Sequence, residues 1–598
     1  MRAPEELHLV DWPRLEHPYG ELADLGDLLR ALYGEDEEAV AGALEEVYWE
    51  ALDLRPEFPV RAAVVPYLAH AAVHATHQRG EVLTCLALAA GKWAGDGLLA
   101  AELPGLLHLL RDEDPEVRYG AVLVARWAEG RARPLAVAGL AERLRADPVE
   151  RVRAEALAAL SRLEEEPAGR LRAALADRAP AVRATAALGL LEAAELPYPD
   201  DLLAVLSADG GGSAFTAGVD LGVLKVREVL DRDAASTRTV AAVWIEAGDV
   251  DGRGSRPALR LADTWRDQEA SAVALLVDAL PRQPDGHRRT AVLEAMARWV
   301  AACPDPAPAA DAALPLVDDP ERKVAREAQL VLGRAGDRRL LTDVPRLALE
   351  ALDALAARTG DPELRRRVLT PRPCTCGRCE PAARVSADRV LAALTPPEAA
   401  ALLPELLALL RVRPNQELVR LLGATGRAEP ELLSLLGELA AAGDRSLAPA
   451  AAAAAVRLGA DPGPALGLFT DRLGADGWTL ADAALLGPAG RPLLPLVEGH
   501  LANGNDWHRA HAAEALWRIT GDPARAVPVL LDLLVPLPVG VFALDALRRT
   551  GAPLPPAARA VVRGWADGER KVLRGSYDRN GEDAVLRAAA RLLLAAQG

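Results

Sequence analysis

The apolar residues of this chain recur with helical spacing rather than with the alternating spacing of β-strands. In one stretch they fall at offsets 0, 4, 7, 8 and 11, at Val117, Ala121, Val124, Ala125 and Ala128. These offsets place the five side chains on one face of an α-helix. No sustained run rich in Val, Ile, Thr and Tyr alternates polar and apolar positions, so the sequence predicts an all-α protein.

The same register returns along the chain, and turn residues separate its copies. Further copies begin at Val152, Val182, Val324, Leu447 and His508. Asp followed by Pro precedes several copies, because Asp caps free N–H groups and Pro tolerates the first helical position. Gly followed by Asp ends others, because Gly adopts the left-handed conformation that closes a helix.

The copies are spaced like the units of a helical repeat protein. Arg118 is followed 35 residues later by Arg153, which is followed 30 residues later by Arg183. A second helix fits between consecutive copies, so the repeating unit is a helical hairpin. A single hairpin cannot bury both of its faces, so neighbouring hairpins must stack. The sequence therefore predicts a right-handed α-solenoid of stacked helical hairpins.

Several segments resemble bacterial HEAT repeats of the phycobilin-lyase-like type. The segments are "DEDPEVRYGAVLVARW", "DPVERVRAEALAALSRL", "DRAPAVRATAALGLL" and "RAHAAEALWRITGDPARAVPVLLDLL". The opening "VDWPRLEHPYGELADLGDLLRAL" is similar to the start of a group of large actinobacterial HEAT-repeat proteins. The resemblance implies a HEAT- or armadillo-like superhelix. It implies little about function, because this fold serves scaffolds, inhibitors, lyases and DNA glycosylases.

We expect six segments, divided according to where the repeat is regular and where it is not. They are a helical cap at 1–100, repeats at 101–195, an irregular helical segment at 196–281, repeats at 282–370, a loop rich in Cys and Pro at 371–386, and repeats at 387–598. The glycine run at 210–212 is not a phosphate loop, because no Gly-Lys-Ser or Gly-Lys-Thr follows it.

Charge and composition narrow the range of partners. Of the 598 residues, 51% are hydrophobic but only 4% are aromatic, and the formal net charge is −17. Such a charge repels nucleic acid and anionic membranes on average, so we expect a protein partner. Arg replaces Lys almost throughout, which is typical of a GC-rich, for example actinobacterial, genome.

The same sequence favours a cytoplasmic location. We find no signal-peptide pattern at the start and no run of about 18 uncharged apolar residues. The five cysteines do not form a disulfide framework, which fits a reducing compartment.

Three thiols lie within six residues, at Cys374, Cys376 and Cys379. Thiolates this close repel one another, and Zn²⁺ relieves the repulsion by neutralising them. The sequence thus predicts a structural zinc clamp, for which Cys303 or a histidine supplies the fourth ligand. The alternative is a reduced, exposed loop.

Two further groups of polar residues have competing interpretations. His70, His74 and His77 have the spacing of one helix face and the chemistry of metal ligands, but packing is the favoured interpretation. Arg365, Arg366 and Arg367 form the densest basic cluster, which is either an anion site or a solvated helix end.

The arginine after the first apolar position recurs in four copies, and it has two interpretations. It lines a ligand-binding face, or it forms a structural ladder between repeats. We favour the ladder, because every repeat must satisfy the polar groups of its turns. These arginines are Arg118, Arg153, Arg183 and Arg509.

The sequence favours a binding scaffold over an enzyme. No Gly-x-Ser-x-Gly, His-Glu-x-x-His or dinucleotide motif is present. A specific version is an inhibitor or immunity protein for a basic partner. The alternatives are a HEAT-like nucleic-acid-binding protein or DNA glycosylase, which needs a basic concave face, and a bilin-lyase-like enzyme or chaperone.

Overall fold

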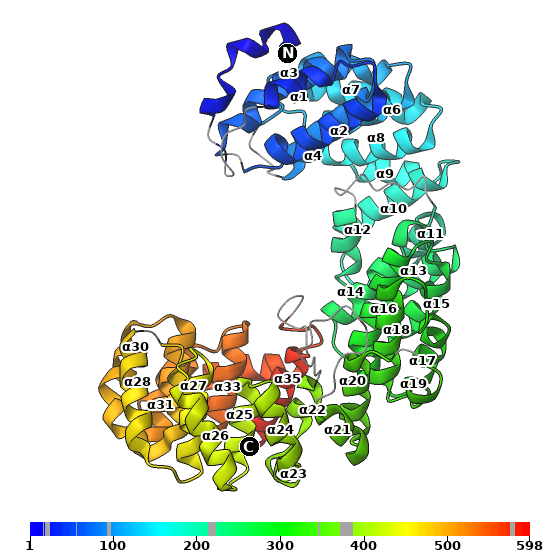
Figure 1. Cartoon of the computed structure of the whole chain (residues 1–598). Coiled ribbons are helices and arrows are strands. Elements are labelled where there is room, and N and C mark those ends of the chain that lie inside the picture. Colours follow the sequence, from blue (N-terminus) through cyan, green and yellow to red (C-terminus); the bar gives the residue numbers. More distant parts are fainter. Residues whose placement is uncertain are drawn as a thin grey trace. The chain divides into compact units, whose positions relative to one another are not determined.

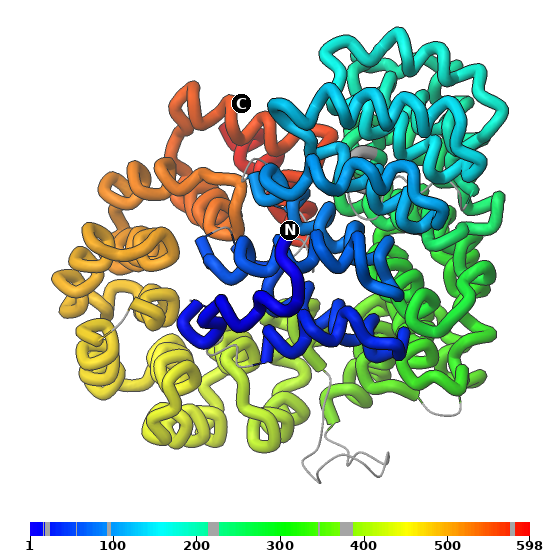
Figure 2. The backbone as a smooth tube through the Cα atoms, turned by 90° about the horizontal axis from the view of Figure 1, so that it is seen from above, coloured from blue at the N-terminus to red at the C-terminus, as the bar shows by residue number. Residues whose placement is uncertain are grey.

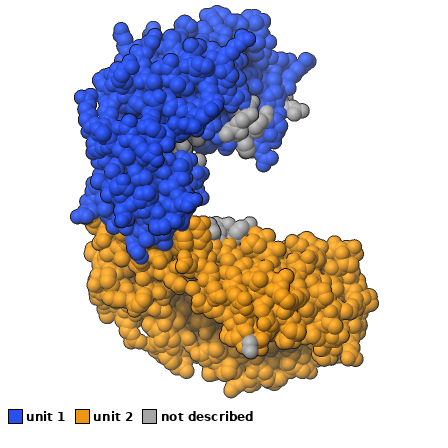
Figure 3. Space-filling model, turned by 180° about the vertical axis from the view of Figure 1, so that it is seen from behind, with its two compact units in different colours: residues 1–258 blue, residues 259–598 orange. Residues whose placement is uncertain are grey.

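A computed structural model describes residues 1–15, 17, 24–55, 57–92, 97–212, 223–344, 347–370, 387–475, 477–573 and 581–597. The chain forms two compact units, unit 1 at residues 1–258 and unit 2 at residues 259–598 (Figure 3). The boundary falls inside the 196–281 segment, where the sequence repeat is least regular. No helix in the described part is long and apolar enough to span a membrane.

Both units consist of stacked helical hairpins (Figure 1). The described residues contain no β-strand, and their one isolated bridge joins Trp265 and Arg570. The predicted all-α array of hairpins is therefore confirmed. Consecutive hairpins place their first helices in one layer, as α6, α8 and α10 show by packing on one another, and their second helices in another layer.

Unit 1 begins with irregular turns and short helices and continues as regular hairpins. Its α-helices are α1 (Leu25–Ala31), α2 (Glu37–Val47), α3 (Pro59–His74), α4 (Arg79–Lys92), α5 (Leu103–Leu106), α6 (Pro115–Ala125), α7 (Ala132–Ala146), α8 (Glu150–Leu163), α9 (Ala168–Ala174), α10 (Pro180–Ala193), α11 (Asp200–Asp209), α12 (Val223–Leu230) and α13 (Ala234–Glu246). The short helices are η1 (Pro4–Leu9), η2 (Trp12–Arg14), η3 (Tyr48–Leu52), η4 (Leu107–Arg111) and η6 (Val250–Gly252).

Helix α14 (Ser255–Thr264) crosses the boundary, and unit 2 continues from it. Its α-helices are α15 (Glu269–Ala279), α16 (Gly286–Trp299), α17 (Ala307–Ala313), α18 (Arg322–Ala335), α19 (Arg339–Thr342), α20 (Leu349–Thr359), α21 (Pro362–Leu369), α22 (Asp388–Ala393), α23 (Pro396–Ala401), α24 (Leu403–Val412), α25 (Gln416–Ala424), α26 (Pro430–Ala441), α27 (Leu447–Arg457), α28 (Pro462–Ala475), α29 (Leu480–Ala483), α30 (Leu494–Asn503), α31 (Asp506–Thr520), α32 (Ala526–Asp532), α33 (Pro538–Thr550), α34 (Pro556–Asp567) and α35 (Glu582–Ala595). The short helices are η7 (Leu280–Arg282), η8 (Val300–Ala302), η9 (Leu314–Leu316) and η10 (Ala484–Leu493).

Small residues let the first helices of neighbouring hairpins approach closely. A Cβ atom added to Gly120 of α6 would lie 2.6 Å from the carbonyl oxygen of Gly80 in α4. A Cβ atom on Gly423 of α25 would lie 2.7 Å from the Cβ of Ala454 in α27. The abundance of Ala and Gly in the sequence is thus explained by helix axes that pack closer than larger side chains allow.

Unit 2 closes on itself. Its first residues hydrogen-bond to its last hairpin: the Arg266 N–H donates to the Glu569 carbonyl at 2.9 Å, and the Lys571 N–H donates to the Thr264 carbonyl at 3.0 Å. Figure 2 follows the hairpins from green through yellow and orange to red, back to the start of the unit. The first helices of the hairpins line the inside of this closed array, and the second helices, such as α28 and α30, lie outside (Figure 1).

Candidate interaction surface

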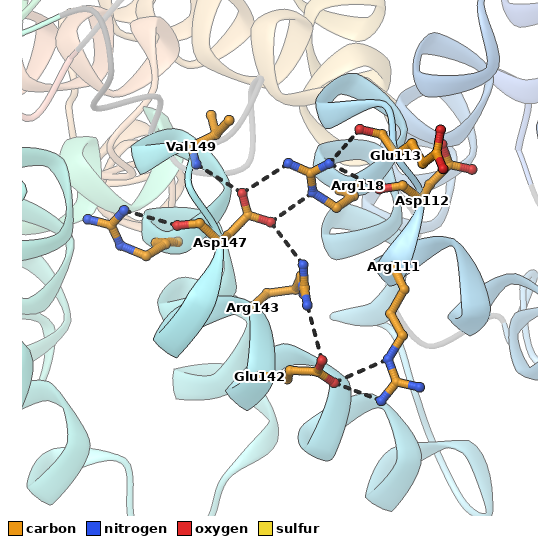
Figure 4. Close-up of polar contacts among 9 residues, drawn as sticks. Arg111, Asp112, Glu113, Arg118, Glu142, Arg143, Asp147 and Val149 are labelled. Carbon is orange, nitrogen blue, oxygen red and sulfur yellow. Dashed lines mark hydrogen bonds and ion pairs between the residues drawn. The ribbon is translucent and has the colours of Figure 1, made fainter.

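The recurring arginines form a structural ladder, as favoured from the sequence. Arg118 at the start of α6 donates through Nε and Nη2 to Asp147 at the end of α7, at 2.8 and 3.2 Å (Figure 4). The equivalent pairs are Arg153 with Asp177, Arg183 with Asp209, and Arg509 with Asp532. Each ladder arginine is therefore committed to an aspartate at the end of the next helix.

The histidines of α3 do not share one helix face. Helix α3 ends at His74, so His77 lies beyond the helix, and the expected i, i+4, i+7 arrangement is wrong. The rings of His70 and His74 lie 4.3 Å apart, and His70 Nδ1 lies 2.7 Å from the Tyr33 hydroxyl. Within the described ranges, no group of three or more metal-ligand side chains has the geometry of a metal site.

The remaining sequence candidates give no site among the described residues. Cys374, Cys376 and Cys379 lie outside those residues, so the zinc clamp stays a prediction. Cys303 is buried, with Sγ 3.7 Å from the Trp299 carbonyl oxygen. In the basic cluster 365–367, Arg365 pairs with Glu398 and Arg366 pairs with Glu405.

The two units differ sharply in charge. Residues 1–258 contain 27 Lys and Arg against 44 Asp and Glu, whereas residues 259–598 contain 42 of each. Unit 1 therefore carries the whole net charge of −17, and unit 2 is neutral. The net charge of the whole chain therefore describes the surface of neither unit.

A polar network crosses the inside of unit 2. Asp482 of α29 accepts hydrogen bonds from Gln416 Nε2 at 3.0 Å and from Arg420 Nε at 2.8 Å, both on α25. Helix α27 packs between α25 and α29, so these side chains reach across it. Helix α27 presents alanines there, and helices α26 and α28 cover its other side. We call this surface, formed by the inward faces of α25, α27, α29, η10, α31 and α33, the inner wall.

The next inner helices carry a second carboxylate and an aromatic patch. Glu514 of α31 is 5% exposed and pairs with Arg518 at 2.8 Å and with Arg549 of α33 at 2.6 Å. His511 lies one turn earlier on the same face of α31, and Trp507, two turns earlier, stacks on His511 with ring centroids 5.7 Å apart. The His511 ring meets the Phe542 ring edge-on at 4.4 Å.

Burial sets the protonation of the histidine at the centre of this patch. Burial lowers the pKa of His511, and the nearby charge of Arg420 lowers it further, while Glu514 and Asp482 act in the opposite direction. His511 is therefore neutral at pH 7, which suits a ring packed between Trp507 and Phe542. Two groups of rings meet at the start of α31, because Trp507 and His508 are consecutive residues. Trp507, His511 and Phe542 form one group, and Trp478, edge-on to His508 at 5.0 Å, forms the other. We call these five residues together the aromatic patch.

The sequence contained a signal for this patch that the apolar register alone does not detect. Trp507, His511, Glu514 and Arg518 recur at offsets 0, 4, 7 and 11, one helix face made of aromatic and charged residues. In a chain of mostly Ala and Leu helices, such a face indicates a surface that is neither core nor ordinary solvated surface. The partners on α29 and α33 are not identifiable from sequence spacing.

Comparison with known proteins identifies no family. No family model matches the chain, and no curated protein matches it. Among solved structures, it is similar to importin beta in an ammonium sulfate condition, with a TM-score of 0.33 and 13% identity over 95% of this chain and 79% of that chain. It is also similar to Kap121p, with a TM-score of 0.32 and 12% identity over 95% of this chain and 78% of that chain.

A third similar structure is the karyopherin Kap121p bound to the extreme C-terminus of the protein phosphatase Cdc14p. Its TM-score is 0.27 and its identity 15%, over 96% of this chain and 60% of that chain. The chain thus spans about 60% of the length of that karyopherin. At these identities and scores, the likeness is one of all-α fold class, and we draw nothing about binding from it.

Proposed function

We propose that this chain is a protein-interaction scaffold whose partner binds the inner wall of unit 2, anchored at the aromatic patch. The observation that carries the proposal is the exposure of Trp507 on the inward face of α31 and of Trp478 beside His508 of the same helix. Trp478 is 63% exposed and Trp507 is 36% exposed, in a chain with only 4% aromatic residues. Tryptophan is the residue most enriched among those that dominate the energetics of protein interfaces.

The surroundings of the two tryptophans support an anchoring role. Trp507 is held by the His511 and Phe542 rings, so its position is fixed before a partner arrives. A preorganised side chain loses little conformational entropy on binding, which raises the affinity that it contributes. Arg420, whose side chain is 37% exposed, brings its charge close to His511, as expected of a polar rim around an apolar centre.

The same network favours binding over catalysis. The carboxylates of Asp482 and Glu514 are buried, and each is held by an arginine and a second donor. A carboxylate committed in this way is a poor general base, because its acceptor oxygens are occupied and its charge is neutralised. We therefore assign these acids to positioning the wall rather than to chemistry.

Alanine variants test the proposal. The double variant Trp478→Ala, Trp507→Ala should lose a partner that the native chain retains from an extract of its host. With the partner purified, the Kd should rise at least 30-fold, because an interface tryptophan contributes about 2 kcal/mol or more. Trp49→Ala, which removes a tryptophan 60% exposed in unit 1, is the matched control and should leave the Kd unchanged. A partner bound equally well by the native chain and the double variant would refute this assignment.

A second candidate follows from the charge of unit 1. With 27 Lys and Arg against 44 Asp and Glu, unit 1 favours a basic partner, as for an inhibitor or immunity protein that neutralises a basic target in the cytoplasm. Electrostatic steering predicts an association rate that falls at least tenfold between about 20 and 150 mM salt. A rate that does not change with salt would argue against this candidate and leave the aromatic anchor untouched.

A further inference from the structure

On the inner wall, the carboxylates are buried and the arginines that pair with them are more exposed. The side chains of Asp482 and Glu514 are 1% and 7% exposed, whereas those of Arg420, Arg518 and Arg549 are 37%, 31% and 27% exposed. The acids are therefore covered by the groups that neutralise them. A partner that reaches this wall meets guanidinium groups first, although unit 2 as a whole is neutral.

One arginine of the wall pairs with no carboxylate among the residues that the structure describes. Arg457 ends α27, its side chain is exposed, and no acidic side chain in the described part of the chain pairs with it. Partial burial and the charge of Arg518 lower the pKa of Arg457, so the two guanidinium groups are close enough to repel. Arg457 therefore adds one positive charge to the three arginines that already pair with Asp482 and Glu514.

Small residues lie between these two arginines. Helix η10 lies between α27 and α31 in the inner layer, and it contributes Gly487, Pro488, Ala489 and Gly490. A Cβ atom added to Gly487 would meet nothing within 4 Å, whereas one added to Gly490 would lie 3.0 Å from Ile519 of α31, so the open space is at Gly487. Arg457 on one side and Arg518 on the other therefore border a strip of small residues with open space at Gly487.

The length of the wall sets the size of the ligand. Inner helices α25, α27, η10, α31 and α33 follow one another, and packed helices lie about 8–10 Å apart, so the wall runs for about 40 Å. An extended polypeptide covers that distance with about 12 residues. Trp507 on α31 provides an apolar contact, and the arginines on α25, α27, α31 and α33 provide charge along the wall.

We propose that the inner wall binds an extended, acidic segment of a partner protein, with Arg457 and Arg518 receiving its carboxylates and Trp507 receiving an apolar side chain. This inference rests on the proposed function and specifies its partner. A nucleic acid is the less favoured anion, because the wall interleaves its arginines with carboxylates and unit 1 repels a dense polyanion. Guanidinium groups bind carboxylates through paired hydrogen bonds, and aromatic rings beside them accept apolar side chains.

The test uses the full-length chain and a fluorescein-labelled peptide of four Glu-Phe-Glu repeats, followed by fluorescence anisotropy at about 50 and 150 mM salt. We expect binding that weakens as salt increases and that is lost when every Glu of the peptide is replaced by Gln. Arg457→Glu should weaken binding at least tenfold. The charge-matched control is Arg525→Glu on the outer layer, where Arg525 pairs with Glu498, and it should change binding less than twofold.

Three results would overturn the inference. They are a peptide that binds equally to the native chain and Arg457→Glu, a Gln peptide that binds as well as the Glu peptide, and a single-stranded 12-nucleotide oligothymidine that binds more tightly than the peptide. Because Arg457 is exposed, equal thermal unfolding of the native chain and Arg457→Glu establishes that folding is intact. The peptide could fail to bind while a host partner still requires Trp507 for binding. That result would show that the partner segment is not acidic, and the proposed function would stand.

Discussion

Arg266 and Asp583 form a buried ion pair across 317 residues of sequence, with Nε and Nη2 of the arginine 2.7 and 3.1 Å from the two carboxylate oxygens. Both side chains are almost fully buried, at 3% and 2% exposed. Arg266 also donates through Nη1 to the carbonyls of Trp565 and Gly568. This one side chain therefore fixes the first turn of unit 2 to its last hairpin.

Breaking this pair should destabilise unit 2 strongly. Arg266→Ala removes the guanidinium group that binds both carboxylate oxygens of the buried Asp583, so we expect a loss of about 3 kcal/mol or more in the free energy of unfolding. The Arg587–Asp267 pair at the same junction is the control, because Asp267 is 74% exposed and Arg587→Ala should cost less than about 1 kcal/mol. Urea unfolding measures both variants, and hydrogen exchange at residues 569–573 locates the effect. Equal losses for the two variants would show that Arg266 is not the main contact between the first turn of unit 2 and its last hairpin.

The ladder makes a similar prediction in unit 1. Arg118 pairs with Asp147, whose side chain is fully buried. Arg118→Ala leaves Asp147 only its longer pair with Arg143 at 3.3 Å, so the change should cost about 2 kcal/mol. Burial alone would raise the pKa of Asp147, but hydrogen bonds from Arg118 and from the Val149 N–H hold it below its usual value. Arg151 pairs with Glu116, which is 63% exposed, so Arg151→Ala should cost less than about 1 kcal/mol. Urea unfolding compares the two, and a ladder arginine that is no more costly to remove than Arg151 would mean that the ladder contributes little.

His511 should make unit 2 less stable in mild acid. Its folded pKa lies below the ordinary value of about 6.5, so the unfolded chain takes up the proton first. Stability is then lost as the pH falls below about 6.5. His511→Phe, which keeps an aromatic ring between Trp507 and Phe542, should show a smaller fall in Tm between pH 7 and 5.5. Identical pH profiles for the native chain and the variant would show that His511 is not buried in solution.

The five cysteines should fall into two classes, buried thiols that react slowly and predicted zinc ligands. Burial raises the pKa of Cys85 to about 12, and burial together with the charge of Glu269 raises that of Cys303. Both thiols should therefore react slowly with a thiol reagent in the folded protein. If Cys374, Cys376 and Cys379 hold zinc as predicted, the native protein contains about one equivalent and Cys376→Ser contains less. Elemental analysis of protein purified without added metal decides this, and zinc far below one equivalent in both would exclude the clamp.

The local pattern of the sequence was sufficient to predict the hairpins. The register beginning at Val117 coincides with α6, and its copies at Val152 and Val182 coincide with α8 and α10. All three valines are fully buried, because the register records which face of a helix is apolar. The ladder was predictable for a related reason, since an arginine at a constant place in each repeat meets the same neighbour in each repeat.

The closure of unit 2 and the inner wall were beyond that kind of inference. Arg266 lies in the segment with the weakest repeat, and nothing near it in sequence indicates Asp583. Asp482 meets Arg420 only because α27 carries alanines over which a long side chain can pass. Such contacts depend on the curvature of the stacked helices, and curvature accumulates from small rotations at each repeat that no single repeat encodes.

Site-specific photo-crosslinking tests the central claim most directly, because it reports where a partner lies on unit 2. A benzoylphenylalanine at position 478 keeps an aromatic ring at the edge of the patch, and the same residue at position 412 places it on outer helix α24, where Val412 is 48% exposed. In extracts of the native host, we expect one protein to crosslink at position 478 and not at 412, and Trp507→Ala should abolish that crosslink. A partner that crosslinks only at position 412, or that crosslinks at 478 regardless of Trp507, would contradict binding at the inner wall.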